Sequence, residues 1–177
     1  ISIAAGKSIA YYEKLLGESR AIVRVMPNTP AAVGRGMSVC VANAKTSEAQ
    51  RQRTAKFMSA VGDVAWIDDE SLMDAVTAVS GSGPAYAFLL VECMAKAGEA
   101  VGLAPDLAMR LARQTVIGSG ELMRLASEDA ATLRKNVTSP GGTTEAALRV
   151  LMADPGLEAL MIKAIDAATK RGRELGG

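Results

Sequence analysis

The spacing of apolar residues divides this chain into two parts. Over the first 68 residues, short apolar or β-branched runs alternate with stretches of helical character. Strands are predicted at residues 1–5, 21–26, 37–42 and 64–67, and helices at residues 8–16 and after a cap at Thr46 or Ser47. Strands that alternate with helices in this way are typical of a parallel or mixed α/β sheet. We therefore expect residues 1–68 to form an α/β part.

From residue 69 to 177, only helical periodicity remains. Helices are predicted at residues 84–101, 105–126 and 144–152, together with a short helix around Leu133 and a last helix capped by Asp154 with Pro155 at its start. The fold class is therefore α/β plus all-α, with a predicted domain boundary between residues 68 and 69.

Composition narrows the range of partners. Hydrophobic residues make up 49% of the chain and aromatic residues only 3%, which favours closely packed helices rich in Ala, Leu, Val and Met. The net charge of +1 gives no indication of a nucleic-acid partner. No apolar run looks long enough to span a bilayer, so we expect no membrane partner. Cys40 and Cys93 are predicted to be buried free thiols, which suits a reducing cytoplasm.

Two absences limit the chemistry. The chain has no histidine, which excludes Ser-His-Asp and Cys-His machinery and ordinary histidine metal sites, so no metal centre is expected. It also begins at Ile1 inside a predicted strand, not at a methionine, so we expect a segment to be missing from its front.

The segment Ser139-Pro140-Gly141-Gly142-Thr143-Thr144 contains the most informative pattern. Two glycines allow the backbone to approach a ligand closely, and the helix predicted after them directs unpaired N–H groups back at the loop. The segment could bind a carboxylate or phosphate, with hydroxyl donors at Ser139, Thr143 and Thr144. It could equally be a tight turn with a threonine cap.

Two further loops are candidates of the same kind. Ser80-Gly81-Ser82-Gly83, before a helix led by Pro84, is either an anion site or a flexible hinge. Asn28, between two prolines after a strand, lies where ligands bind in open α/β sheets, although an ordinary turn has the same pattern. Ala4 and Ala5 offer small side chains beside it. No G-x-G-x-x-G turn is present, and Gly34-Arg35-Gly36 does not qualify because a strand follows it.

Three segments, VRVMPNTPAAVGRGM, DAVTAVSGSGPAYAF and NVTSPGGTTEAAL, in this order and spacing, closely resemble pyrroline-5-carboxylate reductases. The resemblance covers essentially the whole chain. It implies the C-terminal part of a Rossmann-type domain followed by a helical dimerisation domain. It also implies reduction of 1-pyrroline-5-carboxylate to L-proline with NADPH or NADH, in a cytoplasmic homodimer that could assemble into a decamer.

The resemblance also assigns residues. Thr144 would act as the catalytic residue by hydrogen-bonding the ring nitrogen. Substrate binding is implied for Ser139, Gly141, Gly142, Thr143, Thr144, Asn136 and Glu128, and cofactor binding for Ala4, Ala5 and Asn28. The family's glycine-rich cofactor turn is not in this chain, which puts activity of the chain alone in doubt.

Two alternatives remain open at this point. A related hydroxyacid dehydrogenase would use a helix lysine as acid, but the nearest candidate, Lys96, has no such motif around it. The chain could also serve only as a dimerisation module.

Overall fold

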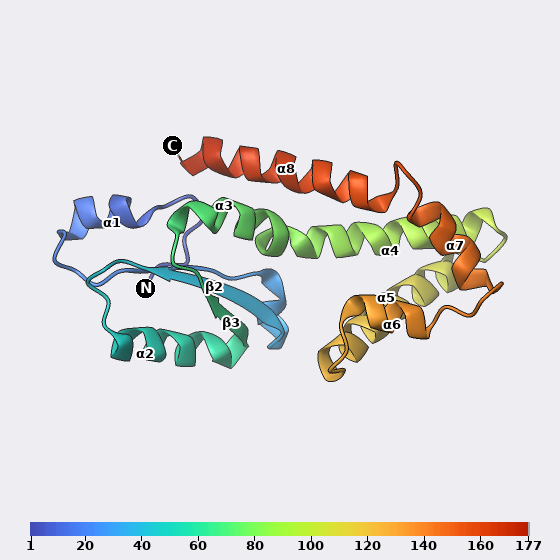
Figure 1. The fold of residues 1–177 in the computed structure, drawn as a ribbon, viewed down its shortest axis with the longest axis horizontal. Helices are drawn as coiled ribbons and strands as arrows, with labels where there is room; N and C mark the ends of the chain where they lie inside the picture. The colour runs from blue at the N-terminus through green and yellow to red at the C-terminus, as the bar shows by residue number, and fades with distance from the viewer. Residues whose placement is uncertain (177) are drawn as a thin grey trace. The chain divides into compact units, whose positions relative to one another are not determined.

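The computed structural model describes residues 1–176 and divides into two compact units (Figure 1). The first contains Ile1–Pro84 and the C-terminal segment from Lys163, and the second contains Ala85–Ile162. Helical structure takes over from Glu70, close to the predicted boundary, whereas the compact units divide at Pro84. The boundary at residues 68 and 69 stays a prediction.

The first unit is built on a mixed three-stranded sheet in the order β1-β2-β3. Strand β1 (Val23–Met26) pairs antiparallel with β2 (Gly36–Ala42), and β2 pairs parallel with β3 (Gly62–Trp66). Three of the predicted strands are thereby confirmed. The run at residues 1–5 forms only one parallel bridge, between Ser2 and Arg24.

Short helices connect and cover these strands. They are α1 (Ile9–Leu16), the 3-10 helices η1 (Thr29–Val33), η2 (Ser59–Val61) and η3 (Glu70–Leu72), α2 (Glu48–Met58), α3 (Met73–Val76) and the π-helical turn η4 (Thr77–Gly81). Ser47, one of the two predicted caps, begins α2 through a complete capping box with Gln50. Thr46 instead donates its hydroxyl to the Ile22 carbonyl and to Asn43.

Two apolar clusters hold the first unit together. One joins Ile9, Ile22, Met26, Val41 and Met73, and the other joins Val23, Val25 and Cys40. Alternate residues of β1 and β2 point to opposite faces, so each strand contributes to both clusters.

The two cysteines differ in environment. Burial raises the pKa of the Cys40 thiol to about 11, so this thiol stays protonated and unreactive near neutral pH. Cys93, in contrast, is exposed on its helix in the single chain. The prediction that both thiols are buried is therefore wrong for Cys93, whose apolar sequence neighbours lie on a helix that is largely open to solvent.

A buried charge pair connects the sheet to the helices of the first unit. The Arg24 guanidinium, in β1, donates to Glu70 Oε1 at 2.9 Å, and the Ile9 backbone N–H donates to the same oxygen at 2.8 Å. Side-chain exposure is only 9% for Arg24 and 27% for Glu70. One carboxylate thus satisfies both a buried cation and the first amide of α1.

We expect Glu70→Ala to lower the free energy of unfolding by about 2 kcal/mol, because it leaves the Arg24 guanidinium unpaired in the core. The double variant Arg24→Met with Glu70→Leu removes both charges and should recover much of that loss. Urea denaturation of the three proteins measures the effect. A single variant as stable as the parent would show that the pair does not anchor the sheet.

The second unit is entirely helical. It contains most of α4 (Gly83–Ala100), then α5 (Pro105–Leu125), α6 (Ala130–Asn136), α7 (Thr143–Leu151) and the start of α8 (Leu157–Gly176). The predicted helices are confirmed. The predicted start of the last helix is wrong, because Asp154 and Pro155 lie in a bend before α8. The first hydrogen bond of α8 runs from the Leu160 N–H to the Gly156 carbonyl.

Candidate active site

The loop between α6 and α7 is shaped by its two glycines. Gly141 has φ +72°, a left-handed conformation that side chains other than glycine rarely adopt. Gly142 closes the turn by donating its N–H to the Ser139 carbonyl at 3.0 Å, and it is the N-cap of α7. A side chain at Gly142 would approach that same carbonyl at 3.0 Å. The glycine pair is therefore required by the turn itself.

The backbone amides of this loop fall into two groups. The Gly141 N–H donates to Glu145 Oε2 at 2.7 Å, and the Gly142 N–H is held by Ser139, so both glycine amides are already bonded inside the loop. Thr143 and Thr144 supply the next two amides, in the first turn of α7. Within residues 1–176 these two amides have no acceptor, because a glycine N-cap has no side chain to offer one.

The hydroxyl groups beside these amides are also open. Thr144 is half-buried at the start of α7, while Thr143 and Ser139 are exposed. None of the three hydroxyls has a hydrogen-bond partner among the described residues. Open amides at a helix start, with hydroxyl donors next to them, favour an anionic ligand such as a carboxylate.

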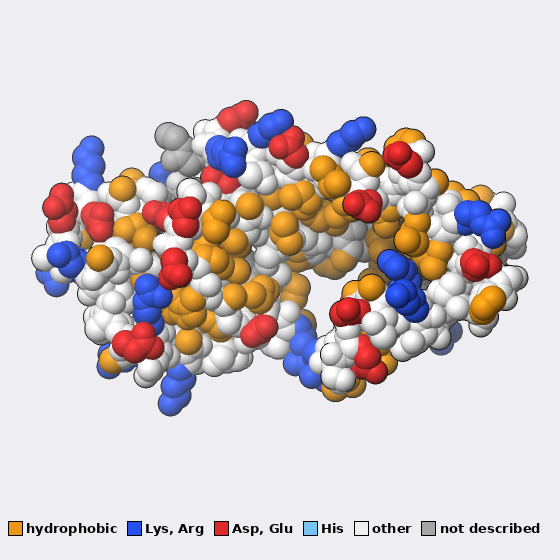
Figure 2. All heavy atoms as spheres, in the orientation of Figure 1, with side chains coloured by type: hydrophobic (Ala, Val, Ile, Leu, Met, Phe, Trp, Pro, Cys, Tyr) orange, Lys and Arg blue, Asp and Glu red, His pale blue; other side chains and the backbone are white. Residues whose placement is uncertain are grey.

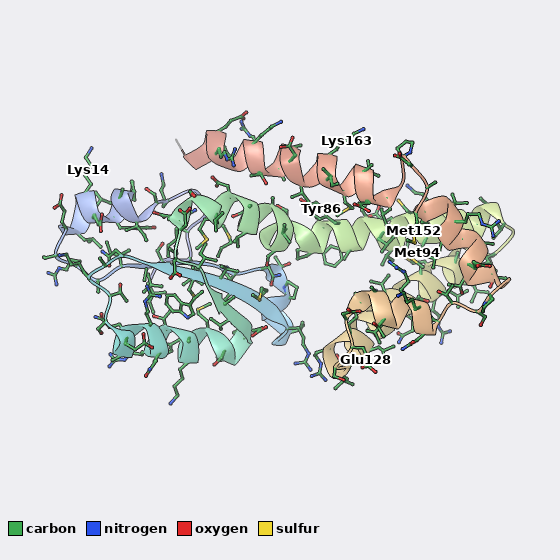
Figure 3. All side chains as sticks on the ribbon, in the orientation of Figure 1. Lys14, Tyr86, Met94, Glu128, Met152 and Lys163 are labelled. Atoms are coloured by element: carbon green, nitrogen blue, oxygen red, sulfur yellow. The ribbon has the colours of Figure 1, made fainter. Side chains whose placement is uncertain are left out.

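Helix α6 positions the other two predicted substrate residues at its opposite ends. Asp129 caps the helix by accepting the Thr132 N–H at 2.7 Å, a hydrogen bond that lowers the pKa of the Asp129 carboxyl. Asn136 is the last residue of α6 and is exposed next to the loop. Glu128 precedes the helix at its far end, by the α5–α6 connection (Figure 3). One chain therefore brings Asn136, but not Glu128, to the glycine loop.

The predicted cofactor residues belong to the first unit. The parallel bridge between Ser2 and Arg24 brings the residues that follow Ser2 alongside the end of β1. Ala4 and Ala5 lie in an exposed turn there, and Asn28 lies two residues beyond β1. The ends of two parallel segments thus meet at one edge of the sheet, which is where ligands bind in this class of fold.

The side chain of Asn28 is engaged in the fold, which the sequence did not indicate. Its Oδ1 accepts the Met37 N–H at 2.8 Å, and its Nδ2 donates to the Ser80 carbonyl and hydroxyl at 3.3 Å each. Asn28 therefore connects the start of β2 to the turn η4. Its side-chain polar atoms are therefore already bonded within the fold. Asn28 could contact a ligand through its backbone, or act indirectly by ordering the loop around it.

Ser80 and Gly81 do not form the open loop or flexible hinge that their sequence suggested. They lie in the π-helical turn η4, where the Ser82 N–H donates to the Thr77 carbonyl at 2.8 Å. The hydrogen bonds from Asn28 to Ser80 stabilise this turn. The alternating Ser and Gly residues are therefore part of a helical stretch that leads into α4. π-Helical turns of this kind are often found at functional sites.

The Gly34–Gly36 segment is confirmed not to be a pyrophosphate turn. Gly34 ends η1 in a left-handed conformation, and β2 starts at Gly36 with no helix following. A side chain at Gly36 would collide with Ala31, at 2.8 Å, so this glycine is needed for packing. The segment offers no helix start at which a pyrophosphate could bind.

A family model described as pyrroline-5-carboxylate reductase dimerisation matches residues 70–175. The chain belongs to the pyrroline-5-carboxylate reductase family. The pyrroline-5-carboxylate reductase of Pseudomonas aeruginosa is 49% identical over 175 residues, which cover 99% of this chain and 64% of the relative. That of Synechocystis is 46% identical over 176 residues, covering 99% of this chain and 65% of the relative. The chain thus spans just under two thirds of these relatives.

Solved structures agree with the family assignment. A pyrroline-5-carboxylate reductase from Coxiella burnetii matches with a TM-score of 0.95 and 41% identity, over 99% of this chain and 65% of that one. The NADP-bound pyrroline carboxylate reductase of Plasmodium falciparum matches with a TM-score of 0.84 and 32% identity, over 99% and 69%. The fold is therefore the C-terminal part of a Rossmann-type domain followed by a helical dimerisation domain.

The helical unit exposes the apolar surface that a dimerisation domain of this family requires. Its fully buried apolar residues are three alanines, Ala95, Ala108 and Ala112, whereas large apolar side chains of α4, α5, α7 and α8 are open to solvent. Figure 2 shows such side chains among these helices. Between α6, α7 and α8 lies a groove of about 670 Å³, and half of its lining residues are Leu, Met or Ile. Exposed apolar side chains in this number, beside an apolar groove, indicate an interaction site.

One helical stretch within residues 1–176, Glu70–Ala100, is long and apolar enough to cross a membrane by length and composition alone. Its mean hydropathy is 1.2, and 11% of its most apolar window is buried. The expectation that every apolar run falls far short of a bilayer is wrong in this respect. The stretch lies within the segment matched by the dimerisation family, which gives its apolar surface another use.

Proposed function

We propose that this chain supplies the substrate-binding and dimerising part of a reductase that converts 1-pyrroline-5-carboxylate to L-proline. The hydride comes from NADPH or NADH. The observation that carries the proposal is the pair of open amides at Thr143 and Thr144, behind a glycine turn whose own amides are already bonded. Membership of the pyrroline-5-carboxylate reductase family supports the choice of a cyclic imino acid as the ligand.

The substrate carboxylate is bound at the start of α7. Its oxygens accept the Thr143 and Thr144 N–H groups and the Ser139 hydroxyl, where the positive end of the helix dipole adds to the attraction. Gly141 and Gly142 shape the loop and let the ring approach the backbone. Asn136 is assigned to the rim of the site. The assignment of Glu128 rests on the family resemblance alone, because one chain does not bring the far end of α6 to this loop.

The Thr144 hydroxyl orients the ring nitrogen. A protonated imine is a cation that accepts a hydride at carbon and becomes a neutral amine, so the step needs no strong side-chain acid. This agrees with a chain that contains no histidine. The role of the protein is to hold the imine carbon about 3.5 Å from the hydride donor in the correct alignment.

A reduced nicotinamide supplies the hydride in this chemistry. Ala4 and Ala5 fit the nicotinamide side of its site, because their small side chains are exposed in a turn at the ligand-binding edge of the sheet. Asn28 orders the neighbouring loop through its bonds to Met37 and Ser80. A pyrophosphate turn is not among the residues of this chain, so the phosphates have to be bound elsewhere in the complete reductase.

The experiment is a direct assay of the full-length reductase. Purified protein is mixed with NADPH or NADH and 1-pyrroline-5-carboxylate, and both the loss of reduced nicotinamide and the formation of L-proline are followed. A β-hydroxyacid with oxidised cofactor is the control substrate. Oxidation of the hydroxyacid without reduction of the imine would overturn the proposal.

We propose that the chain is cytoplasmic and that its partner is a second copy of itself. The helical unit cannot bury its own large apolar side chains, so two units cover one another in a homodimer, and dimers could assemble further into a decamer. In this proposal, the apolar surface of the stretch Glu70–Ala100 serves the contact between the two copies.

We expect Ile117→Glu to weaken dimerisation by at least about tenfold, because it places a charge in a surface that must lose water. Ile117 lies near the middle of α5 and is 54% exposed in the single chain, so the change costs the protomer itself little. Ser119→Glu adds the same charge at an exposed polar position on the opposite side of α5 and is the control. Sedimentation velocity measures both, and an unchanged dimer in the Ile117 variant would contradict this interface.

A further inference from the structure

Glu145 has a hydrogen bond that its place in α7 does not by itself require. Its Oε2 accepts the N–H of Gly141, four residues earlier, at 2.7 Å. Gly141 is the residue with φ +72°, on the loop side of the N-cap Gly142. The carboxylate therefore reaches past the helix start and bonds the residue of the loop that has a positive φ.

This arrangement is half of a capping box, displaced by one residue. In the complete motif, as Ser47 and Gln50 form it in α2, the N-cap side chain bonds a first-turn amide while the third helical residue bonds the N-cap amide. In α7 the cap is Gly142, which has no side chain, and Glu145 bonds Gly141 instead of the cap. The loop is fastened from one side only, and the amides of Thr143 and Thr144 stay open.

We propose that Glu145 is a positioning residue for the substrate carboxylate. It fastens the glycine turn so that the open amides and the Ser139 hydroxyl face the ligand in one fixed arrangement, without occupying them. This inference rests on the proposed function. The hydrogen bond from the Gly141 N–H and the positive end of the α7 dipole partly offset the repulsion between the Glu145 carboxylate and a bound anion.

The role depends on accepting a hydrogen bond, so Glu and Gln should serve equally well. Glu145→Gln keeps an oxygen that can accept the Gly141 N–H, whereas Glu145→Ala removes it. We expect Glu145→Ala in the full-length reductase to raise the KM for 1-pyrroline-5-carboxylate by roughly tenfold, about the size of one lost hydrogen bond. Glu145→Gln should stay within about twofold of the parent, and the KM for NADPH should not move in either variant.

A substrate without the carboxylate separates positioning from a general structural effect. The probe is 1-pyrroline, which has the same imine ring but nothing for the loop to bind. Glu145→Ala should leave kcat/KM for 1-pyrroline unchanged. Glu48→Ala is the matched control, because Glu48 lies in the first turn of α2 and its side chain bonds only Gln52 of its own helix among residues 1–176. It should affect neither substrate.

Three results would overturn the inference. A lower KM for 1-pyrroline-5-carboxylate in Glu145→Ala would mean that the carboxylate blocks the site. Equal losses with both imines would mean a structural role only, and equal losses in the Gln and Ala variants would mean that charge matters and the hydrogen bond does not. If the parent protein reduces neither imine, the proposed function fails instead. Hydrogen exchange at the Gly141 amide then still decides whether Glu145 orders the loop.

Discussion

Thr144→Ala in the full-length reductase is expected to lower kcat/KM for 1-pyrroline-5-carboxylate by about ten- to a few hundredfold. The hydroxyl is half-buried at the start of α7 and is unbonded among the described residues, so it is available to the substrate. A hydrogen bond to a charged group contributes about 1.5–3 kcal/mol, which corresponds to this range of rates. The loss should appear mainly in kcat if the hydroxyl orients the nitrogen during hydride transfer.

Two companion variants make the Thr144 result specific. Thr144→Ser retains the hydroxyl and should keep most of the activity. Thr138→Ala removes a hydroxyl from the preceding turn, where it donates to the Arg134 carbonyl at 2.6 Å, and should have little effect on kcat. Steady-state kinetics with both substrates varied measures all three. Parent-like kinetics in Thr144→Ala would remove Thr144 from the catalytic role.

A protein consisting only of residues 1–177 is expected to bind NADPH very weakly and to turn over little or not at all. The reason lies in the turns that this chain contains. The Gly34–Gly36 segment runs from a 3-10 helix into β2, so it presents no helix start to a pyrophosphate. In the proposed assignment, the small turn at Ala4 and Ala5 contacts only the nicotinamide end of the cofactor. Most of the binding energy for the phosphates is therefore missing.

Calorimetric titration with NADPH measures this expectation, with circular dichroism to show that the chain is folded. The full-length reductase is the positive control and should bind under the same conditions. Micromolar binding to the folded 177-residue protein would contradict the expectation. It would mean that the exposed turns of the first unit recognise the cofactor without a glycine-rich phosphate loop.

Much of the fold could be predicted from local pattern. The β-branched runs that became β1 and β2 alternate across a sheet with two buried faces, and the positions of Pro84 and Pro105 indicate helix starts that the structure confirms. The single bridge at Ser2 shows the limit of this reasoning. An apolar run becomes a full strand only where a neighbouring strand offers a complete set of partners.

The features that pattern could not predict depend on contacts between distant residues. The π-helical turn at Ser80 is fixed by Asn28, which lies 52 positions away along the chain. Cys93 is exposed because it lies on a helix whose apolar side chains are largely open to solvent in the single chain. The late start of α8 depends on a bend at Asp154 that local capping rules read as a helix start.

The sequence predicted which segment forms the candidate site, but it did not predict the hydrogen bonds within that segment. The glycine pair and the threonines indicated an anion-binding loop, and the structure gives that loop the required helix start. Which amides are open could not be predicted, because it depends on the Glu145 side chain turning back to Gly141. We therefore propose the Thr143 and Thr144 amides as the donors to the ligand, whereas the glycine amides are bonded within the turn.

A crystal structure of the full-length reductase with bound L-proline tests the central claim most directly. The product has the same carboxylate as the substrate. We expect its oxygens within hydrogen-bond distance of the Thr143 and Thr144 amides, with the ring nitrogen near the Thr144 hydroxyl and the Gly141–Glu145 bond intact. Proline held at another place, with these two amides covered by protein, would contradict the account.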